Sequence, residues 1–258
     1  MGELTDHMCW DLYWKDARLP ITVDRKSDPY YRTLDELFRI HLGRSHKRFL
    51  EVGCGSSKWL IYFFENFRYD VYGVDSSEKA CNLSKMNMRL MGVPGEVLCS
   101  DIFDPPFHGP CFDVILSGGL IEHFTNPQAV LKRMVALLRP GGHLITSVPN
   151  IESIYWVIQK LIDKKVYEQH FKITIKALGS LYERLGLRID VIRYVGSFDL
   201  FSIDWSRIRS RSKTWRTIGM PLVGKINGAI NLGLKKSKID FRSRVFSPFI
   251  IVIGYIPF

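Results

Sequence analysis

Short apolar runs alternate with longer helix-like segments through most of this chain. The runs are largely apolar on both faces, which is typical of strands buried inside a parallel sheet. Five of them predict the strands Arg48–Gly53, Val71–Asp75, Glu96–Ser100, Val114–Ser117 and His143–Val148. The segments between them predict the helices Ser57–Asn66, Ser77–Met91 and Pro127–Leu138. This alternation predicts an α/β fold with a doubly wound, mostly parallel sheet.

Two further strands are expected near the end of the chain. The predicted helices Ile151–Asp163 and Thr174–Leu185 precede the strand Arg188–Val195, and Phe249–Ile256 predicts the last strand. That last run is far shorter than the ~20 apolar residues that a membrane-spanning helix needs. We therefore expect seven strands, with residues 206–246 as an insertion between the last two.

This insertion holds the excess positive charge of the protein. Residues 206–246 contain eleven Lys or Arg and one Asp, whereas the rest of the chain carries equal numbers of acidic and basic residues. Leu222, Ile226, Ile230 and Leu234 recur at every fourth position after Pro221, which predicts one amphipathic helix. A basic amphipathic helix suits an anionic membrane surface, but a helix packed on the protein with a solvated basic rim explains the pattern equally.

Composition places the chain among cytoplasmic proteins with one principal domain. Its 258 residues suffice for one α/β core, and its five cysteines form no Cys-x-x-Cys pair. An odd cysteine number without such pairs argues against both a zinc site and a secreted disulfide framework. Charged residues interrupt residues 1–25, so no signal peptide is expected there. We expect a cytoplasmic protein, with the insertion as a candidate for peripheral attachment to the inner face of the membrane.

Candidate chemistry begins at the end of the first predicted strand, where the sequence reads Glu51-Val-Gly53-Cys-Gly55-Ser-Ser57. Glycines allow positive φ and close approach of a ligand, and Ser56 or Ser57 is expected to cap the next helix. A dinucleotide fingerprint would need a third glycine where this chain has Lys58. Glu51 would also repel a pyrophosphate but suits an ammonium group. The turn thus predicts a nucleotide cofactor with an amino-acid end.

Several motifs in unbroken order resemble class I S-adenosylmethionine-dependent methyltransferases of the small-molecule group. They are the glycine turn, Val71-Tyr-Gly-Val-Asp75, Cys99-Ser-Asp101-Ile102, the strand ending Leu120-Ile-Glu-His123, and Leu137-Leu-Arg-Pro-Gly-Gly142. The resemblance covers about residues 47 to 200. It implies a Rossmann-like sheet whose last two strands form an antiparallel pair, and S-adenosylmethionine as methyl donor, with S-adenosylhomocysteine as product.

The resemblance also implies roles for particular residues. The donor site would comprise Glu51, Gly53, Cys54, Gly55, Asp75, Ser76, Asp101, Ile102 and Ser117. Asp75 would bind the ribose hydroxyls, Glu51 the amino group through water, and Asp101 with Ile102 the adenine. Helix capping is the alternative role for Asp75. No metal is expected, because the carboxylate trio of magnesium-dependent relatives is not evident.

Methylation of an oxygen acceptor also requires a base, and two histidines are candidates. His123 follows the fourth strand, and His170 lies in the acceptor lid of the resembled enzymes. Either could equally be a structural or surface histidine. We expect a small-molecule, glycan or lipid-linked acceptor, held by an N-terminal helical cap (residues 1–46) rich in aromatic residues. The methyltransferase domain would then comprise residues 47–205 and 247–258.

The motifs give other functions weaker support. Asp104-Pro-Pro-Phe107 is similar to the tetrapeptide with which some methyltransferases hold a flipped base, but it follows the third strand rather than the fourth. Nucleic acid is therefore not favoured as a partner, and the insertion has few aromatic residues for base stacking. RNA or N-methylation remains the alternative within enzymes. A membrane-associated assembly subunit that binds the donor without catalysis is the alternative of another class.

Overall fold

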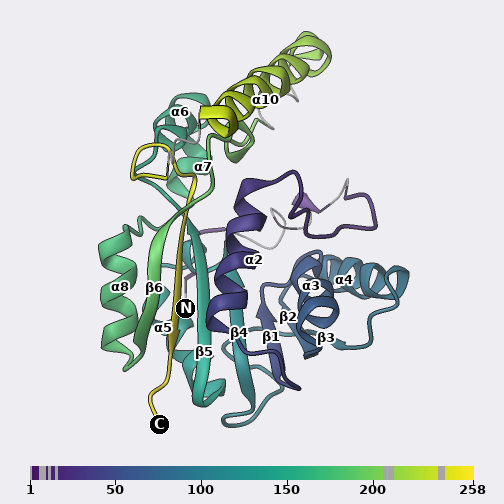
Figure 1. Ribbon diagram of the computed structural model, residues 1–258, viewed down its shortest axis with the longest axis vertical. Coiled ribbons are helices and arrows are strands. Elements are labelled where there is room, and N and C mark those ends of the chain that lie inside the picture. The colour runs from purple at the N-terminus through teal and green to yellow at the C-terminus, as the bar shows by residue number, and fades with distance from the viewer. Residues whose placement is uncertain are drawn as a thin grey trace.

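The centre of the molecule is one seven-stranded sheet (Figure 1). The computed structural model describes residues 2–5, 10, 13–14, 17–205, 208, 212–237 and 242–258. The strands are β1 (Arg48–Val52), β2 (Asp70–Asp75), β3 (Glu96–Cys99), β4 (Phe112–Gly118), β5 (Leu138–Pro149), β6 (Arg188–Val195) and β7 (Phe249–Tyr255). Their order is β3-β2-β1-β4-β5-β7-β6, and only β7 runs antiparallel to its neighbours. The predicted sheet with an antiparallel last strand is confirmed.

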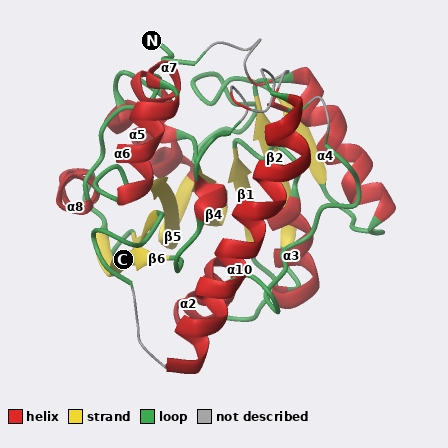
Figure 2. Cartoon of the chain, turned by 90° about the horizontal axis from the view of Figure 1, so that it is seen from above, coloured by secondary structure: helices red, strands yellow, loops and turns green. Residues whose placement is uncertain are grey.

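Helices cover both faces of the sheet (Figure 2). One layer contains α2 (Pro29–His41), α3 (Lys58–Phe67) and α4 (Glu78–Leu90), and the other contains α5 (Pro127–Leu137) and α8 (Ile175–Arg184). Successive residues of β1 serve opposite layers, since Phe49 packs with α3 and Leu50 with α5. The doubly wound arrangement is therefore also confirmed. The helices that follow β1 and β4 lie on opposite faces, so the crevice between the ends of these strands is a topological switch point, where ligands bind in such sheets.

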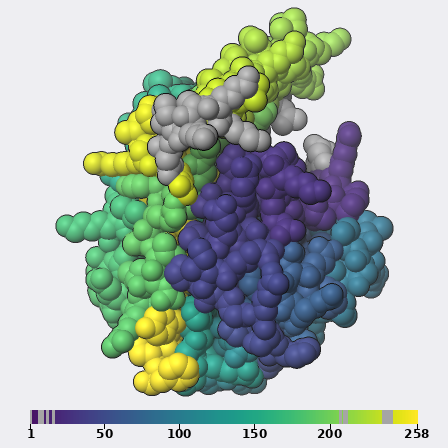
Figure 3. Space-filling model, viewed as in Figure 1, coloured from purple at the N-terminus to yellow at the C-terminus, as the bar shows by residue number. Residues whose placement is uncertain are grey.

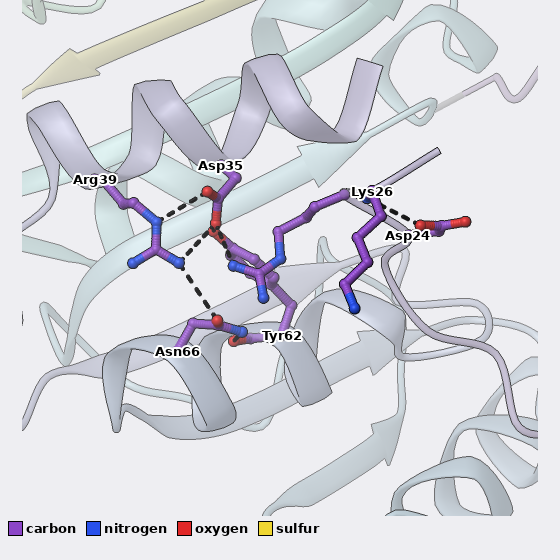
Figure 4. Close-up of polar contacts among 7 residues, drawn as sticks. Asp24, Lys26, Asp35, Arg39, Tyr62 and Asn66 are labelled. Carbon is purple, nitrogen blue, oxygen red and sulfur yellow. Dashed lines mark hydrogen bonds and ion pairs between the residues drawn. The ribbon is translucent and has the colours of Figure 1, made fainter. Parts of the chain in front are cut away.

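Side-chain contacts of Asp35 fix α2 onto α3 (Figure 4). Asp35 accepts hydrogen bonds from Tyr62 Oη at 2.7 Å and from Arg25 Nη1 at 2.9 Å, and Arg39 donates to both of its carboxylate oxygens. Burial alone would raise the pKa of Asp35, but these donors hold it at about 2. The charged network anchors α2 on α3, where Lys58 also donates to Tyr31 of the first turn of α2.

The segment after β5 differs from its prediction. The expected helix Ile151–Asp163 begins three residues later, as α6 (Ile154–Ile162), and is followed by the short α7 (Lys164–Glu168). The cause is Asn150, whose Nδ2 donates to Arg244 O and Ser247 O, both at 2.8 Å, while Oδ1 accepts from Glu152 N. These bonds tie residues 150–153 to the insertion and delay the helix.

The insertion forms α10 (Met220–Ser237), preceded by the π-helical turn η3 (Trp215–Gly219). The predicted helix near Pro221 is thus present, and it projects beyond the end of the sheet where α6 and α7 lie (Figures 1 and 3). None of the helices in the described part of the chain is both long and apolar enough to span a membrane. Of the basic residues, Arg207, Arg209, Arg211 and Lys238 lie outside the described residues.

A face other than the predicted apolar stripe attaches α10 to the domain. Val223 is buried, Asn227 accepts a hydrogen bond from Leu200 N at 2.9 Å, and Asn231 donates to Phe198 O at 2.7 Å. Leu222 and Ile226 of the stripe remain 53% and 43% exposed. The helix is therefore packed on the domain, yet the first part of its apolar stripe faces solvent.

Candidate functional site

The glycine turn joins β1 to α3 and is tied to the neighbouring strand β2. Gly53 and Gly55 have φ angles of 73° and 48°, in the region that favours glycine. Gly53 N and Cys54 N both donate to Val74 O, at 2.8 and 3.2 Å. A Cβ atom added at Gly53 would lie 3.2 Å from Leu120 Cδ1. Both backbone conformation and space therefore require glycine at this turn.

The start of α3 is not capped as the sequence predicts. Ser57 has a left-handed conformation (φ 61°) and no capping hydrogen bond; its Oγ donates instead to Ser84 O at 3.2 Å. The predicted serine cap is therefore absent at Ser57, whose hydroxyl links the glycine turn to α4 instead.

Asp75 lies where the end of β2 meets the glycine turn. Its Oδ2 accepts from Gly55 N at 3.0 Å and its Oδ1 from Ser77 N at 2.9 Å. Ser77 Oγ caps α4 by accepting from Ala80 N. Asp75 is thus not the cap of α4; it braces the glycine turn with a half-buried carboxylate at the edge of the crevice.

The other predicted donor-site residues differ in their surroundings. Cys54 is buried with its Sγ 3.6 Å from Ser84 Oγ, so only its backbone faces the turn. Ser76 and Asp101 are exposed, and Asp101 Oδ1 accepts from Phe103 N. Ile102 is buried in the α5 layer. Ser117 is fully buried, and its Oγ has no hydrogen-bond partner among the described residues.

The two predicted base candidates lie side by side, although 46 residues separate them in the chain. The rings of His123 and His170 are 4.4 Å apart between centroids. His123 also contacts the Trp10 ring at 4.7 Å, and His170 contacts the Trp156 ring at 4.7 Å. Four segments that are distant in sequence therefore form one aromatic cluster at the end of β4.

The two histidines differ in what their ring nitrogens contact. His123 Nδ1 lies 2.9 Å from Thr5 Oγ1, and the ring also hydrogen-bonds the Gln169 backbone. Burial lowers the pKa of His123 to about 3. His170 Nδ1 lies 2.8 Å from Val166 O, which can only accept, so this nitrogen carries the proton and Nε2 has the lone pair. Burial also lowers the pKa of His170.

N-terminal aromatic residues join this cluster to the glycine turn. Trp14 N donates to Trp10 O, and a Cβ atom added at Gly55 would lie 2.4 Å from the Trp14 ring. Tyr30 Oη lies 2.9 Å from Ser147 Oγ, near the end of β5. These contacts place N-terminal side chains beside the glycine turn and near the end of β5; the predicted cap over residues 1–46 stays a prediction.

Glu122, beside His123, was not among the site residues that the sequence predicted. Glu122 is 2% exposed, and neither of its carboxylate oxygens has a partner within the described ranges. Burial raises its pKa to about 8. Its place in the Leu120–His123 motif could have indicated a site residue. Only the fold shows that its carboxylate has no hydrogen-bond partner among the described residues.

Asp104-Pro-Pro-Phe107 lies away from the crevice. It lines a cavity of about 310 Å³ with Arg133, Ala136 and Leu137 of α5. Phe107 packs on Phe112, at the start of β4, with ring centroids 4.9 Å apart. The motif is therefore at the opposite end of β4 from a base-flipping site. Nor do the described residues contain a group of three or more His, Cys, Asp or Glu side chains placed to hold a metal ion.

Comparisons with known proteins agree on the domain. Residues 50–146 match the methyltransferase domain family. The ubiquinone biosynthesis O-methyltransferase of Coxiella burnetii is 33% identical over 104 residues, which are 40% of this chain and 44% of that relative. The chain thus matches less than half the length of this curated relative.

Solved structures share the fold across most of this chain. Phosphoethanolamine N-methyltransferase 2 of Haemonchus contortus in complex with S-adenosyl-L-methionine has a TM-score of 0.59 and 15% identity, covering 98% of this chain and 57% of that one. The [4+2]-cyclase SpnF has a TM-score of 0.62 and 14% identity, covering 97% and 92%. At these identities the likeness concerns the fold alone.

The residues present fit S-adenosylmethionine as the cofactor. Gly53 and Gly55 have the positive φ angles of a turn whose backbone a ligand can approach, and the unpartnered Glu51 Oε2 is a buried acceptor on the strand that precedes them. The half-buried Asp75 adds a second acceptor at the end of β2. With the sheet order, these features identify residues 50–146 as a methyltransferase domain that uses S-adenosylmethionine.

Proposed function

We propose that this protein transfers a methyl group to an oxygen atom of a small-molecule, glycan or lipid-linked acceptor. The observation that carries the proposal is the His123–His170 pair at the end of β4, because methylation of a hydroxyl requires loss of its proton. The Coxiella relative is named an O-methyltransferase, which supports oxygen as the acceptor atom.

The donor-site assignment follows the crevice between β1, β2 and β4. Bound S-adenosylmethionine supplies a methyl group that is already activated as a sulfonium, so the protein has to orient it and exclude water. Asp75 would hold the ribose hydroxyls, and Gly53, Cys54 and Gly55 would approach it through their backbone. The other residues that we assign to the donor site are Glu51, Ser76, Asp101, Ile102 and Ser117.

His170 is the better candidate for the base. Its Nδ1–H is held by Val166 O, which leaves the Nε2 lone pair to take a proton from the acceptor hydroxyl. His123 already has two hydrogen-bonding contacts, so we assign it the role of holding the His170 ring in place.

A screen for the acceptor tests the proposal. The protein is incubated with methyl-labelled S-adenosylmethionine and fractions of cell extract, and the labelled product is analysed for an oxygen–methyl bond. Label in a small molecule or lipid-linked fraction would support the proposal. Label on nitrogen or in RNA would favour the alternative methyltransferase, and binding without turnover in any fraction would favour a non-catalytic donor-binding subunit.

A peripheral membrane location on the inner face of the membrane is a second proposal, favoured by the exposed face of α10. Leu222, Ile226 and the neighbouring Ile218 are exposed apolar side chains. Lys213, Arg216 and Lys225 are exposed in the same segment. Apolar side chains bordered by cations are what an anionic lipid surface attracts, and a lipid-linked acceptor would be reached there.

A further inference from the structure

Two free thiols, those of Cys81 and Cys99, lie together at the carboxyl ends of β2 and β3. Cys81 belongs to α4 and is 1% exposed, whereas Cys99 is the last residue of β3 and is exposed. Cys81 Sγ lies 3.3 Å from Asp75 O and 3.7 Å from Leu98 O. Cys99 Sγ lies 3.8 Å from Ser76 O. Both sulfur atoms therefore contact the backbone of the same two strand ends.

The two thiols differ in ionisation and in access to solvent. Burial raises the pKa of Cys81 to about 12, and the neighbouring Cys99 thiol adds to that rise. Cys81 therefore stays protonated at neutral pH, and the exposed Cys99 is the thiol that a dissolved oxidant meets first. An accessible cysteine with a second cysteine beside it is typical of sites of reversible oxidation.

The other cysteines in the described ranges lack this arrangement. Cys54 is buried, and its Sγ lies 3.6 Å from Ser84 Oγ. Cys111 directly precedes β4, so it lies at the opposite end of the parallel strands from Cys99. Cys99 is thus the exposed one of these four cysteines, and Cys81 is the thiol beside it.

The thiol pair is connected to the glycine turn through Asp75. Asp75 and Cys99 are opposite each other in the pairing of β2 with β3. Asp75 O accepts from Ser100 N at 3.0 Å as well as from the Cys81 thiol. The carboxylate of the same residue accepts from Gly55 N in the turn. A change at the two sulfur atoms would therefore reach the residue that braces the turn.

We propose that Cys81 and Cys99 form a reversible disulfide in the presence of hydrogen peroxide, and that this modification weakens binding of the methyl donor. The Cys99 sulfur attacks one peroxide oxygen, the O–O bond breaks, and Cys99 becomes a sulfenic acid while one water leaves. The Cys81 sulfur then attacks the Cys99 sulfur. The S–S bond forms, the S–O bond breaks, and the hydroxyl leaves as water with the Cys81 proton. Two thiols are oxidised and one peroxide is reduced to two waters.

The disulfide would change the donor site in two ways. It removes the S–H that donates to Asp75 O, and it ties α4 to the end of β3, which continues into Asp101 and Ile102. We expect binding about tenfold weaker, comparable to the loss of one hydrogen bond. By linkage, a saturating ligand should raise the reduction potential of the pair by about 30 mV. This consequence rests on the donor site of the proposed function, whereas the disulfide itself does not.

Peptide mapping after peroxide treatment tests the disulfide. Trypsin releases Cys81 in residues 80–85 and Cys99 in residues 90–132, which also contain Cys111. The two peptides should be linked in the parent and in Cys111→Ser, the matched control, and dithiothreitol should separate them. The link should be absent from Cys99→Ser and from Cys81→Ala. Oxidation of Cys99 to a sulfinic acid without a link, or a link to a cysteine other than Cys81, would overturn the proposal.

Calorimetric binding of S-adenosylhomocysteine tests the consequence. The oxidised parent should bind about tenfold more weakly than the reduced parent, dithiothreitol should restore the affinity, and Cys99→Ser should bind alike before and after peroxide. An unchanged affinity of the oxidised parent, or an equal loss in Cys99→Ser, would overturn the effect on the donor. If the reduced parent binds no ligand, the donor assignment fails, while peptide mapping still decides the disulfide. Urea unfolding midpoints show that all affinities refer to folded protein.

Discussion

The proposed donor half and the proposed acceptor half of the crevice are built in different ways. Most donor-site residues come from one continuous stretch, from Glu51 to Ile102, and depend on the backbone of two strand ends. The acceptor half brings together Thr5, Trp10, His123, Trp156 and His170, whose contacts are between side chains. In the proposed function, cofactor recognition thus depends on local chain geometry, whereas acceptor chemistry depends on tertiary packing.

The two halves also differ in the charge of their side chains. In the donor half, Asp75 accepts two backbone hydrogen bonds. There the charge of Lys58 opposes the rise in the pKa of Glu51 that burial causes. In the acceptor half, burial lowers the pKa of both histidines and raises that of Glu122. The acceptor half therefore favours neutral side chains, which suits removal of a proton from a neutral hydroxyl.

The largest expected effect is on the base. His170→Ala should lower the turnover rate by about 10²–10⁴-fold without weakening donor binding, because the lost contribution is proton removal. The neutral imidazole is the active form, so the rate of the parent should rise with pH and level off; the lowered pKa places this rise below about pH 6.5. Methyl transfer from labelled donor, measured across pH, checks both statements.

The His123 variant is the companion of this test. His123→Gln should weaken turnover less than His170→Ala and keep the pH profile of the parent, since we assign it a positioning role. Retained turnover in His170→Ala would reverse the two assignments. So would a pH–rate profile that loses its rise at acidic pH in His123→Gln alone.

The next effect concerns α10, which extends from the acceptor side. Replacing Lys213, Arg216 and Lys225 by Ala should weaken binding to anionic vesicles about 100-fold, because each cation near the lipid contributes ~1 kcal/mol. Flotation with phosphatidylglycerol vesicles measures this, and added salt should weaken binding of the parent in the same direction. The same change at the exposed Lys79, Lys85 and Lys132 is the control. Equal losses in both triple variants would indicate attraction by net charge rather than docking through α10.

The smallest effect is on stability. Glu122 has a folded-state pKa of about 8, so between pH 4.5 and pH 8 the unfolded chain releases a proton that the folded state retains, and stability falls as pH rises. Glu122→Gln removes this cost and should gain roughly 1–3 kcal/mol relative to the parent between pH 5 and pH 6.5. Urea unfolding at both pH values measures the gain, with the exposed Glu65→Gln as control. A difference between variant and parent that is the same at both pH values would contradict the account.

The difference between local geometry and tertiary packing also decides which features the sequence could predict. The strands, the antiparallel β7 and the glycine turn follow from local patterns, because apolar runs and glycines act through the backbone next to them. The Ser57 cap failed because its hydroxyl donates to Ser84 O, 27 residues later, instead of accepting from the helix. The ring contact of His123 with His170 and the isolation of Glu122 depend on packing between distant segments, which no short pattern reports. The orientation of the α10 stripe likewise depends on Asn227 and Asn231, polar residues that bind the domain backbone.

The central claim is that the crevice beside Asp75 binds S-adenosylmethionine, and calorimetric titration tests it most directly. The parent protein should bind S-adenosylmethionine, and Asp75→Ala should bind it about 100-fold more weakly, because hydrogen bonds to a carboxylate contribute roughly 1.5–3 kcal/mol. Asp70→Ala, at the exposed opposite end of β2, should bind like the parent. Tight binding by Asp75→Ala, or no binding by the parent, would contradict the account.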